Sequence, residues 1–291
     1  MRRAELAIIA IAFVWGATFV VVKNALADAS PVLFLALRFS LAALALGLIF
    51  RRAKPGGAVR ARAVLAGSTL TGLFLFTGYA LQTIGLRYTT ASKSAFLTGL
   101  SIVLVPVFAA VFERKPPRPS EAVGVAIAAV GMGLMTLRGP SLAMSAGDLL
   151  TVGCAAAFAV HILLMGHYSP KFGFEVFTTL QIAVAAALAA GTFWWIEPYW
   201  VRWTPGLIAA IAVTGLLATA LAFSVQSWAQ QYTSPTRTAL IFAAEPVFAW
   251  VTSFATAGEV LSRQAALGAG LILAGILLVE LRRNGRGPSG R

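Results

Sequence analysis

The second half of the chain repeats the first half at a constant offset of 144 residues. The segment QTIGLRYTTASKSAF, which begins at Gln82, aligns without a gap with QSWAQQYTSPTRTAL, which begins at Gln226. Far downstream, the same offset still places Gly131 on Gly275. Shared hydrophobicity does not explain the match, because glutamine, tyrosine and cationic residues are rare in apolar segments. The pattern indicates a duplicated unit. The predicted repeats are residues 1–140 and residues 141–291, the latter with a basic C-terminal tail.

The composition assigns the chain to the lipid bilayer. Hydrophobic residues make up 59% of the chain and charged residues only 11%, whereas soluble domains carry about 25% charged residues. A membrane-spanning helix needs about 20 apolar residues. We therefore predict an all-α polytopic membrane protein with ten spans, five per repeat. The predicted spans are residues 5–27, 32–50, 63–87, 91–112, 120–138, 148–168, 174–196, 205–230, 236–257 and 263–282.

An odd number of spans per repeat places the two repeats in opposite orientations across the membrane. Inverted repeats of this kind are typical of secondary transporters. Of the 23 lysines and arginines, 16 fall on the side that holds both termini, six fall on the other side, and Arg38 lies inside a span. This bias predicts cytoplasmic N- and C-termini. The net charge of +13 then faces anionic lipid, and we expect no nucleic-acid partner.

The first span has an alternative interpretation as a cleaved signal. Two arginines precede it, and Ala25 and Ala27 give the small-x-small pattern of a cleavage site. However, the apolar run from Leu6 to Val22 has 17 residues, more than the roughly 7 to 15 of a signal core. Its removal would also leave one repeat with four spans. We therefore keep it as the first span.

Proline and glycine distinguish the last two spans of each repeat. Pro106 and Pro246 lie inside the fourth spans, where a proline bends a helix, so they are candidate hinges. A tolerated kink in a buried span is the equal alternative. The fifth spans carry small residues at close-packing intervals and are expected to pack against each other or against a second copy, which leaves a monomer or a homodimer open. These residues are Gly124, Ala128, Gly131, Gly268 and Gly275.

Five short motifs occur in an order and spacing that resemble the drug/metabolite transporter superfamily, specifically its ten-span EamA-like group. They are WGATFVVVKNAL at 15–26, the Arg38-Phe39 pair, YTTASKSAFL at 88–97, YTSPTRTALIF at 232–242 and the Glu245-Pro246-Val247 step. The resemblance implies ten helices in two inverted five-helix repeats around a central cavity walled by spans 1, 3, 4, 6, 8 and 9, with alternating access. Within this group the chain is similar to bacterial exporters of amino acids, aromatic ones included. It also implies the bacterial inner membrane.

Aromatic and polar residues share helix faces within these six spans. A residue three or four positions on lies on the same face of a helix. The pair Tyr79 and Gln82 recurs in the second repeat as Phe223 and Gln226. Packing in the core or against lipid is the alternative for each aromatic residue alone, but an aromatic pocket with a few polar groups is typical of a small-molecule site. The candidate substrate-binding residues are Trp15, Phe19, Tyr79, Gln82, Phe158, His161, Phe223, Gln226, Phe242 and Glu245.

Two ionisable residues lie at membrane depth, where charges are costly and usually functional. Glu245 is about nine residues into its span, or about 14 Å, which is close to the middle of a ~30 Å hydrocarbon core. It is either a site for a proton or a substrate amine, or a structural carboxylate. For Arg38 we expect a structural role, because the resemblance places span 2 outside the cavity wall. His161 on its own is more typical of a satisfied buried histidine than of a proton carrier.

The sequence argues against catalysis. It has no phosphate-binding glycine loop, no HExxH motif and no Cys/His ligand set, and Cys154 is its single cysteine. We expect no enzyme activity, no metal and no cofactor. The predicted function is alternating-access export of small organic solutes, foremost amino acids or related amphipathic metabolites. The alternatives are a proton-coupled multidrug or metabolite exporter, a channel or scaffold, and a membrane-embedded transferase.

Overall fold

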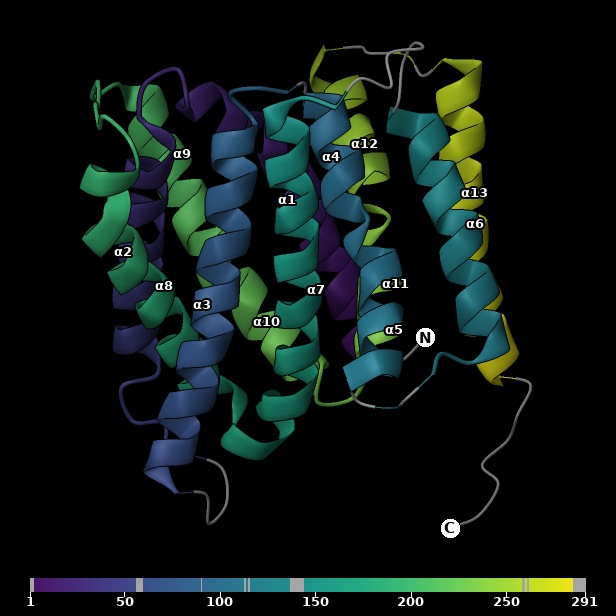
Figure 1. Cartoon of the computed structure of the whole chain (residues 1–291), viewed down its shortest axis with the longest axis horizontal. Helices are drawn as coiled ribbons and strands as arrows, with labels where there is room; N and C mark the ends of the chain where they lie inside the picture. The colour runs from purple at the N-terminus through teal and green to yellow at the C-terminus, as the bar shows by residue number, and fades with distance from the viewer. Residues whose placement is uncertain are drawn as a thin grey trace.

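The computed structural model describes most of the chain. The described residues are 3–55, 60–89, 91–112, 114, 116–136, 144–257, 260 and 262–284. Within them the regular structure is helical, apart from an isolated β-bridge between Ala29 and Val201. The helices form one bundle, in which α2 and α8 lie towards one edge and α6 and α13 stand side by side at the opposite edge (Figure 1). The all-α prediction is confirmed for this part of the chain.

The helices of the first half are α1 (Arg3–Ala25), α2 (Pro31–Ile49), α3 (Ala61–Gly85), α4 (Ala91–Gly99), α5 (Ser101–Phe112) and α6 (Pro119–Thr136). Those of the second half are α7 (Ala146–Phe172), α8 (Phe174–Ile196), α9 (Pro205–Gly215), the π-helical segment η1 (Leu216–Leu221), α10 (Ala222–Ala229), α11 (Pro235–Phe242), α12 (Glu245–Ala257) and α13 (Arg263–Asn284).

Local sequence signals set several of these helix starts. Proline occupies the first position of α2, α9 and α11, where its fixed φ suits a helix and its missing N–H costs no bond. In α9 and α11 a preceding threonine or serine also accepts a bond from a free N–H of the first turn. A complete capping box, formed by Ser145 and Asp148, begins α7.

Helix boundaries in the two halves coincide at the offset of 144 residues. The continuous α3 begins at Ala61 and ends at Gly85, and the α9–η1–α10 segment begins at Pro205 and ends at Ala229, each 144 residues later. Likewise, α5 begins at Ser101 and α12 begins 144 residues later. The division into two repeats at residue 140 remains a prediction, and this coincidence supports it.

The tight packing predicted for the two glycine-rich spans is confirmed, and it occurs between the spans themselves. A Cβ added to Gly124 would lie 2.8 Å from the carbonyl oxygen of Gly275, and one added to Gly131 would lie 2.6 Å from that of Gly268. Because the earlier glycine of α6 faces the later glycine of α13, the two helices are antiparallel. Equivalent helices therefore run in opposite directions at this contact, as an inverted repeat requires.

Within the described part of the chain, eight helical segments are long and apolar enough to cross a membrane. They are Arg3–Ala25, Pro31–Ile49, Ala61–Gly85, Ser94–Phe112, Ala146–Phe172, Phe174–Ile196, Pro205–Ala229 and Arg263–Leu281. The predicted span 120–138 corresponds to the shorter apolar helix Pro119–Met135, and its last two residues lie outside the described part of the chain. The predicted span 236–257 is divided into α11 and α12. The ten-span count therefore remains a prediction.

The fourth span of each half is interrupted at an equivalent position. In the first half α4 ends before Leu100, and in the second half α11 and α12 are separated by Ala243 and Ala244. Of the two prolines, Pro106 lies inside a helix, α5, as expected. Pro246 instead lies in the first turn of α12, where proline removes no helical bond. The hinge roles of both prolines remain predictions.

Candidate functional site

One cavity of about 330 Å³ lies among α1 to α7 and α10 to α12. Nine of the ten predicted substrate-binding residues line it, and they come from both halves of the chain. These are Trp15, Tyr79, Gln82, Phe158, His161, Phe223, Gln226, Phe242 and Glu245. The side chain of the tenth, Phe19, lies outside the described residues. The geometry brings the predicted residues together, while their role in binding remains a prediction.

Aromatic rings form a connected wall of this cavity. The ring of Trp15 lies 5.3 Å from that of Phe223 and 4.9 Å from that of Phe242, measured between centroids. Tyr79 packs edge-on against Phe158 at 5.2 Å and lies 6.3 Å from Phe223. Because Trp15 and Tyr79 come from the first half and the three phenylalanines from the second, this wall joins the two halves. Edge-to-face pairs of this kind hold rings in defined orientations.

The two equivalent glutamines make different hydrogen bonds. The Nε2 of Gln82 donates to the Oγ1 of Thr98 at 3.0 Å, whereas the Nε2 of Gln226 donates to the Oε1 of Gln230 at 2.9 Å. Gln230 in turn donates its Nε2 to the carbonyl of Ile162 at 2.9 Å. A carbonyl only accepts, so this chain fixes the orientation of both amides. The Oε1 of Gln226 is consequently a buried acceptor without a hydrogen bond among the described residues.

His161 is held by a polar residue that the sequence analysis missed. Its Nε2 lies 3.0 Å from the Oε1 of Gln181, whose Nε2 lies 3.1 Å from the sulfur of Met165. The histidine is 2% exposed and its ring packs edge-on against Phe223. This arrangement agrees with the expectation of a satisfied buried histidine. Gln181 could have been identified from the sequence, because an amide side chain inside an apolar helix needs a hydrogen-bond partner.

Glu245 begins α12 immediately after the interruption at Ala243 and Ala244, and it lines the cavity. Within the described part of the chain its carboxyl group makes no hydrogen bond or ion pair. Helix α1 reaches this point through Gly16, where an added Cβ would lie 2.6 Å from the Glu245 carbonyl oxygen. A glycine is therefore required for α1 and α12 to approach this closely. The carboxyl group is available to a ligand.

The expectation that Arg38 lies outside the cavity wall is wrong, because this residue of α2 lines the cavity. Its Nε donates to the Oγ1 of Thr219 at 2.7 Å, and its Nη2 lies 3.2 Å from both the hydroxyl of Tyr79 and the carbonyl of Ala218. The guanidinium carbon lies 4.7 Å from the centroid of the Tyr79 ring. All these partners are electrically neutral. Sequence analysis missed Arg38 because the resemblance assigned its span to the exterior of the cavity.

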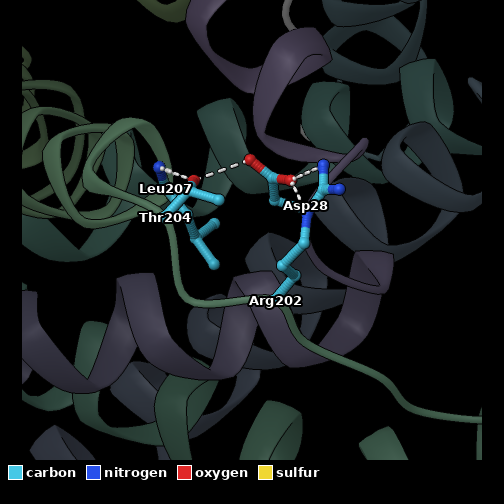
Figure 2. A network of polar contacts seen from close by, with 4 residues as sticks. All are labelled: Asp28, Arg202, Thr204 and Leu207. Atoms are coloured by element: carbon cyan, nitrogen blue, oxygen red, sulfur yellow. Dashed lines mark hydrogen bonds and ion pairs between the residues drawn. The ribbon is translucent and has the colours of Figure 1, made fainter.

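Outside the cavity, a polar network joins the loop after α1 to the segment before α9 (Figure 2). Asp28 accepts hydrogen bonds from the Oγ1 of Thr204 at 2.7 Å and from the Nε of Arg202 at 2.8 Å. Thr204 in turn accepts a bond from the N–H of Leu207. The hydroxyl of Thr204 and the guanidinium of Arg202 lower the pKa of Asp28. The network therefore contains a stable carboxylate at this end of the bundle.

Comparison with known proteins agrees with this architecture. The sequence model of the EamA-like transporter family matches residues 2–137 and again residues 145–281. An uncharacterized transporter of Archaeoglobus fulgidus is 32% identical over 283 residues, which cover 96% of this chain and 86% of that protein. The uncharacterized transporter YyaM of Bacillus subtilis is 27% identical over 275 residues, covering 90% of this chain and 88% of that protein.

A solved structure titled "Crystal structure of protein" superposes with a TM-score of 0.79 and covers 98% of this chain and 100% of that chain. At 19% identity it supports the fold alone. The family match and the apolar helices together define the class of protein, a multi-pass membrane transporter. The chain belongs to the EamA-like transporter family, within the drug/metabolite transporter superfamily.

Proposed function

We propose that the protein is a secondary transporter of the bacterial inner membrane that exports amino acids, aromatic ones among them, by alternating access. The observation that carries this proposal is the cavity itself. It combines a wall of aromatic rings with groups of both charge signs, Arg38 and Glu245, neither of which has an ion-pair partner among the described residues. An amphipathic solute with a charged end and an apolar side chain fits such a surface.

The acceptor groups of the cavity match an ammonium group. Glu245 supplies a carboxyl group and Gln226 supplies an unpaired amide oxygen, and both residues line the same cavity. The ring cluster of Trp15, Phe223 and Phe242 offers apolar contact and cation–π attraction beside them. An amino acid with an aromatic or large apolar side chain would use both features.

The proposed transport cycle uses ten spans in two inverted repeats, with both termini in the cytoplasm. The interruptions at Leu100 and at Ala243–Ala244 lie in equivalent helices and adjoin the cavity-lining residues Ser101 and Glu245. Bending there, with Pro106 and Pro246 as hinges, would open the cavity to one side of the membrane at a time. The antiparallel α6–α13 pair supplies a fixed support within a monomer or a homodimer.

Reconstitution tests this function. The purified full-length chain in liposomes should accumulate labelled tryptophan, phenylalanine or another amino acid from a panel above the level of empty liposomes, and excess unlabelled substrate should abolish the signal. A panel without uptake or exchange of any amino acid, in liposomes whose protein is folded by size-exclusion analysis, would refute the proposal.

Proton-coupled export of multiple drugs or metabolites is the second candidate, and the unpartnered carboxyl group of Glu245 favours it. A carboxyl group that is exposed alternately to each side can carry a proton against the substrate. Under this mechanism Glu245→Gln should keep substrate exchange across the liposome membrane and lose accumulation driven by a pH gradient. Transport by the unchanged protein that is indifferent to the pH gradient would contradict proton coupling and leave facilitated export.

A further inference from the structure

The π-helical segment η1 holds Arg38 by two adjacent residues. The hydroxyl of Thr219 donates to the carbonyl of Thr214, five residues earlier, at 2.8 Å. Its only proton is thus used, so the hydroxyl serves Arg38 as an acceptor. The carbonyl of Ala218 receives both the Nη2 of Arg38 at 3.2 Å and the Nε1 of Trp15 at 2.8 Å. Departures from regular helix of this kind often lie at functional sites.

The equivalent segment of the first half lacks this arrangement. Helix α3 is continuous from Ala61 to Gly85, although it has the same bounds at the 144-residue offset. The offset also places Ile182 of α8 at the position of Arg38. The positions 144 residues away from Arg38 and from η1 therefore supply neither a guanidinium nor a π-helical segment to the cavity.

A donor count leaves part of the guanidinium unused. Of its five N–H groups, the one on Nε and the pair on Nη2 are taken up by Thr219, Tyr79 and Ala218. The two on Nη1 have no acceptor among the described residues. Arg38 is only 3% exposed. A buried cation that is surrounded by neutral groups is costly, and an anion beside it would remove much of that cost.

We propose that Arg38 binds the carboxylate group of the transported solute, with η1 as the element that positions it. This inference rests on the proposed transport of amino acids and names the group that recognises their acidic end. The Nη1 of Arg38 supplies two donors, and the hydroxyl of Tyr79, which accepts from Arg38, keeps its own proton for the second carboxylate oxygen. Trp15 is bonded to the same carbonyl as Arg38, so an aromatic wall begins directly beside the anion site.

Binding of three indole compounds to the purified full-length protein isolates the carboxylate. Tryptophan carries both charged groups, indole-3-propionate lacks the amine, and tryptamine lacks the carboxylate. We expect the unchanged protein to bind tryptophan about 10- to 100-fold more tightly than tryptamine, because only tryptophan forms the charge-assisted bonds to Arg38. Indole-3-propionate keeps these bonds and should also bind. In Arg38→Gln the preference for tryptophan over tryptamine should fall to near unity, and Arg38→Lys should retain part of it.

Two threonine variants test the positioning role of η1. Thr219→Val removes the acceptor for Nε and should reduce the carboxylate preference by about 3- to 10-fold. Thr214→Val is the matched control, because its hydroxyl donates to Ala210 and does not contact Arg38. The control should leave the preference unchanged. Since the readout is a ratio of affinities within one variant, a change in the amount of folded protein does not alter it.

Several outcomes would overturn the inference. These are equal binding of tryptophan and tryptamine by the unchanged protein, a carboxylate preference that persists in Arg38→Gln, and equal loss of all three ligands in that variant. Suppression of the preference when chloride is added to a low-salt buffer without carboxylate anions would also overturn it, because a small anion would then be the occupant. Binding of indole-3-propionate without binding of tryptophan would instead support the anion site while refuting amino-acid transport.

Discussion

Two of the places where the halves of the chain meet, the α6–α13 contact and the cavity, differ in the size of the side chains that form them. At the α6–α13 contact the glycines Gly124, Gly131, Gly268 and Gly275 bring backbone against backbone, and an added methyl group has no room. At the cavity the halves meet through large rings from α1, α3, α7 and α10, which enclose about 330 Å³. Small side chains allow close backbone packing at the first contact, whereas large rings leave a cavity at the second.

The two contacts also differ in how far positions 144 residues apart match one another. The α6–α13 contact is symmetric. Gly124 of α6 faces Gly275 of α13, and their equivalents at the 144-residue offset, Gly268 and Gly131, face each other in turn. The cavity is asymmetric, since Arg38 and η1 have no counterpart in the other half. We infer that the glycine contact maintains the fold and that Arg38, which is present in one half only, helps to determine what is bound.

The largest effect is expected at the scaffold. In Gly131→Leu the new side chain would meet the carbonyl oxygen of Gly268 at 2.6 Å and the backbone nitrogen of Ile272 at 2.8 Å. Neither group is the flexible end of a side chain, so the helices must separate, and we expect a loss of stability of about 3 kcal/mol or more. Folded yield and thermal unfolding in detergent measure it. Gly270→Leu on α13 is the control, because nothing lies within 4 Å of a Cβ added there.

A loss of transport with the fold retained is expected at the cavity. Trp15→Ala removes the ring that contacts Phe223 and Phe242, and with it the stacking surface for an apolar solute. We expect uptake to fall about tenfold or more at low substrate concentration, while most of the folded yield remains. Trp195→Ala is the control, since that residue is 83% exposed on the surface of the bundle. Equal losses in both variants would remove the distinction between cavity and surface.

The smallest effect is expected at Asp28, outside both contacts. Thr204 and Arg202 lower the pKa of Asp28 in the folded protein. Its contribution to stability is therefore fully present above the pKa of an ordinary aspartate, about 4, and is lost as the pH falls through the lower pKa of the folded state. Asp28→Asn should lower the Tm by no more than about 2 °C at pH 7, and the difference should shrink in acid. Glu175→Gln provides a control carboxylate; a difference that grows in acid would contradict this assignment.

The sequence predicted those parts of the structure that depend on spacing within one helix. Tyr79 and Gln82, and their equivalents Phe223 and Gln226, share helix faces, and all four line the cavity. The glycine pattern likewise predicted that the two glycine-rich spans pack closely, against each other or against a second copy, and the α6–α13 contact is the first of these alternatives.

Contacts that depend on irregular backbone were not predictable in the same way. Arg38 enters the cavity because η1 offers the carbonyl of Ala218 and the hydroxyl of Thr219, and no periodic pattern marks a π-helical segment. Likewise, the sequence analysis predicted a bend at Pro246, whereas the helix is interrupted at Ala243 and Ala244, before Glu245. A proline in an apolar segment is compatible with two structures, a kink inside one helix and the first turn of a new helix. The sequence alone does not distinguish them.

Photochemical labelling tests most directly the central claim that the cavity is the substrate-binding site. A diazirine analogue of phenylalanine, irradiated with the purified full-length protein, should form adducts on Trp15, Tyr79 or Phe223, and mass spectrometry of the peptides locates them. Excess unlabelled phenylalanine should prevent these adducts. Adducts that are confined to exposed positions such as Trp194 and Trp195, or cavity adducts that persist with the competitor present, would contradict the account.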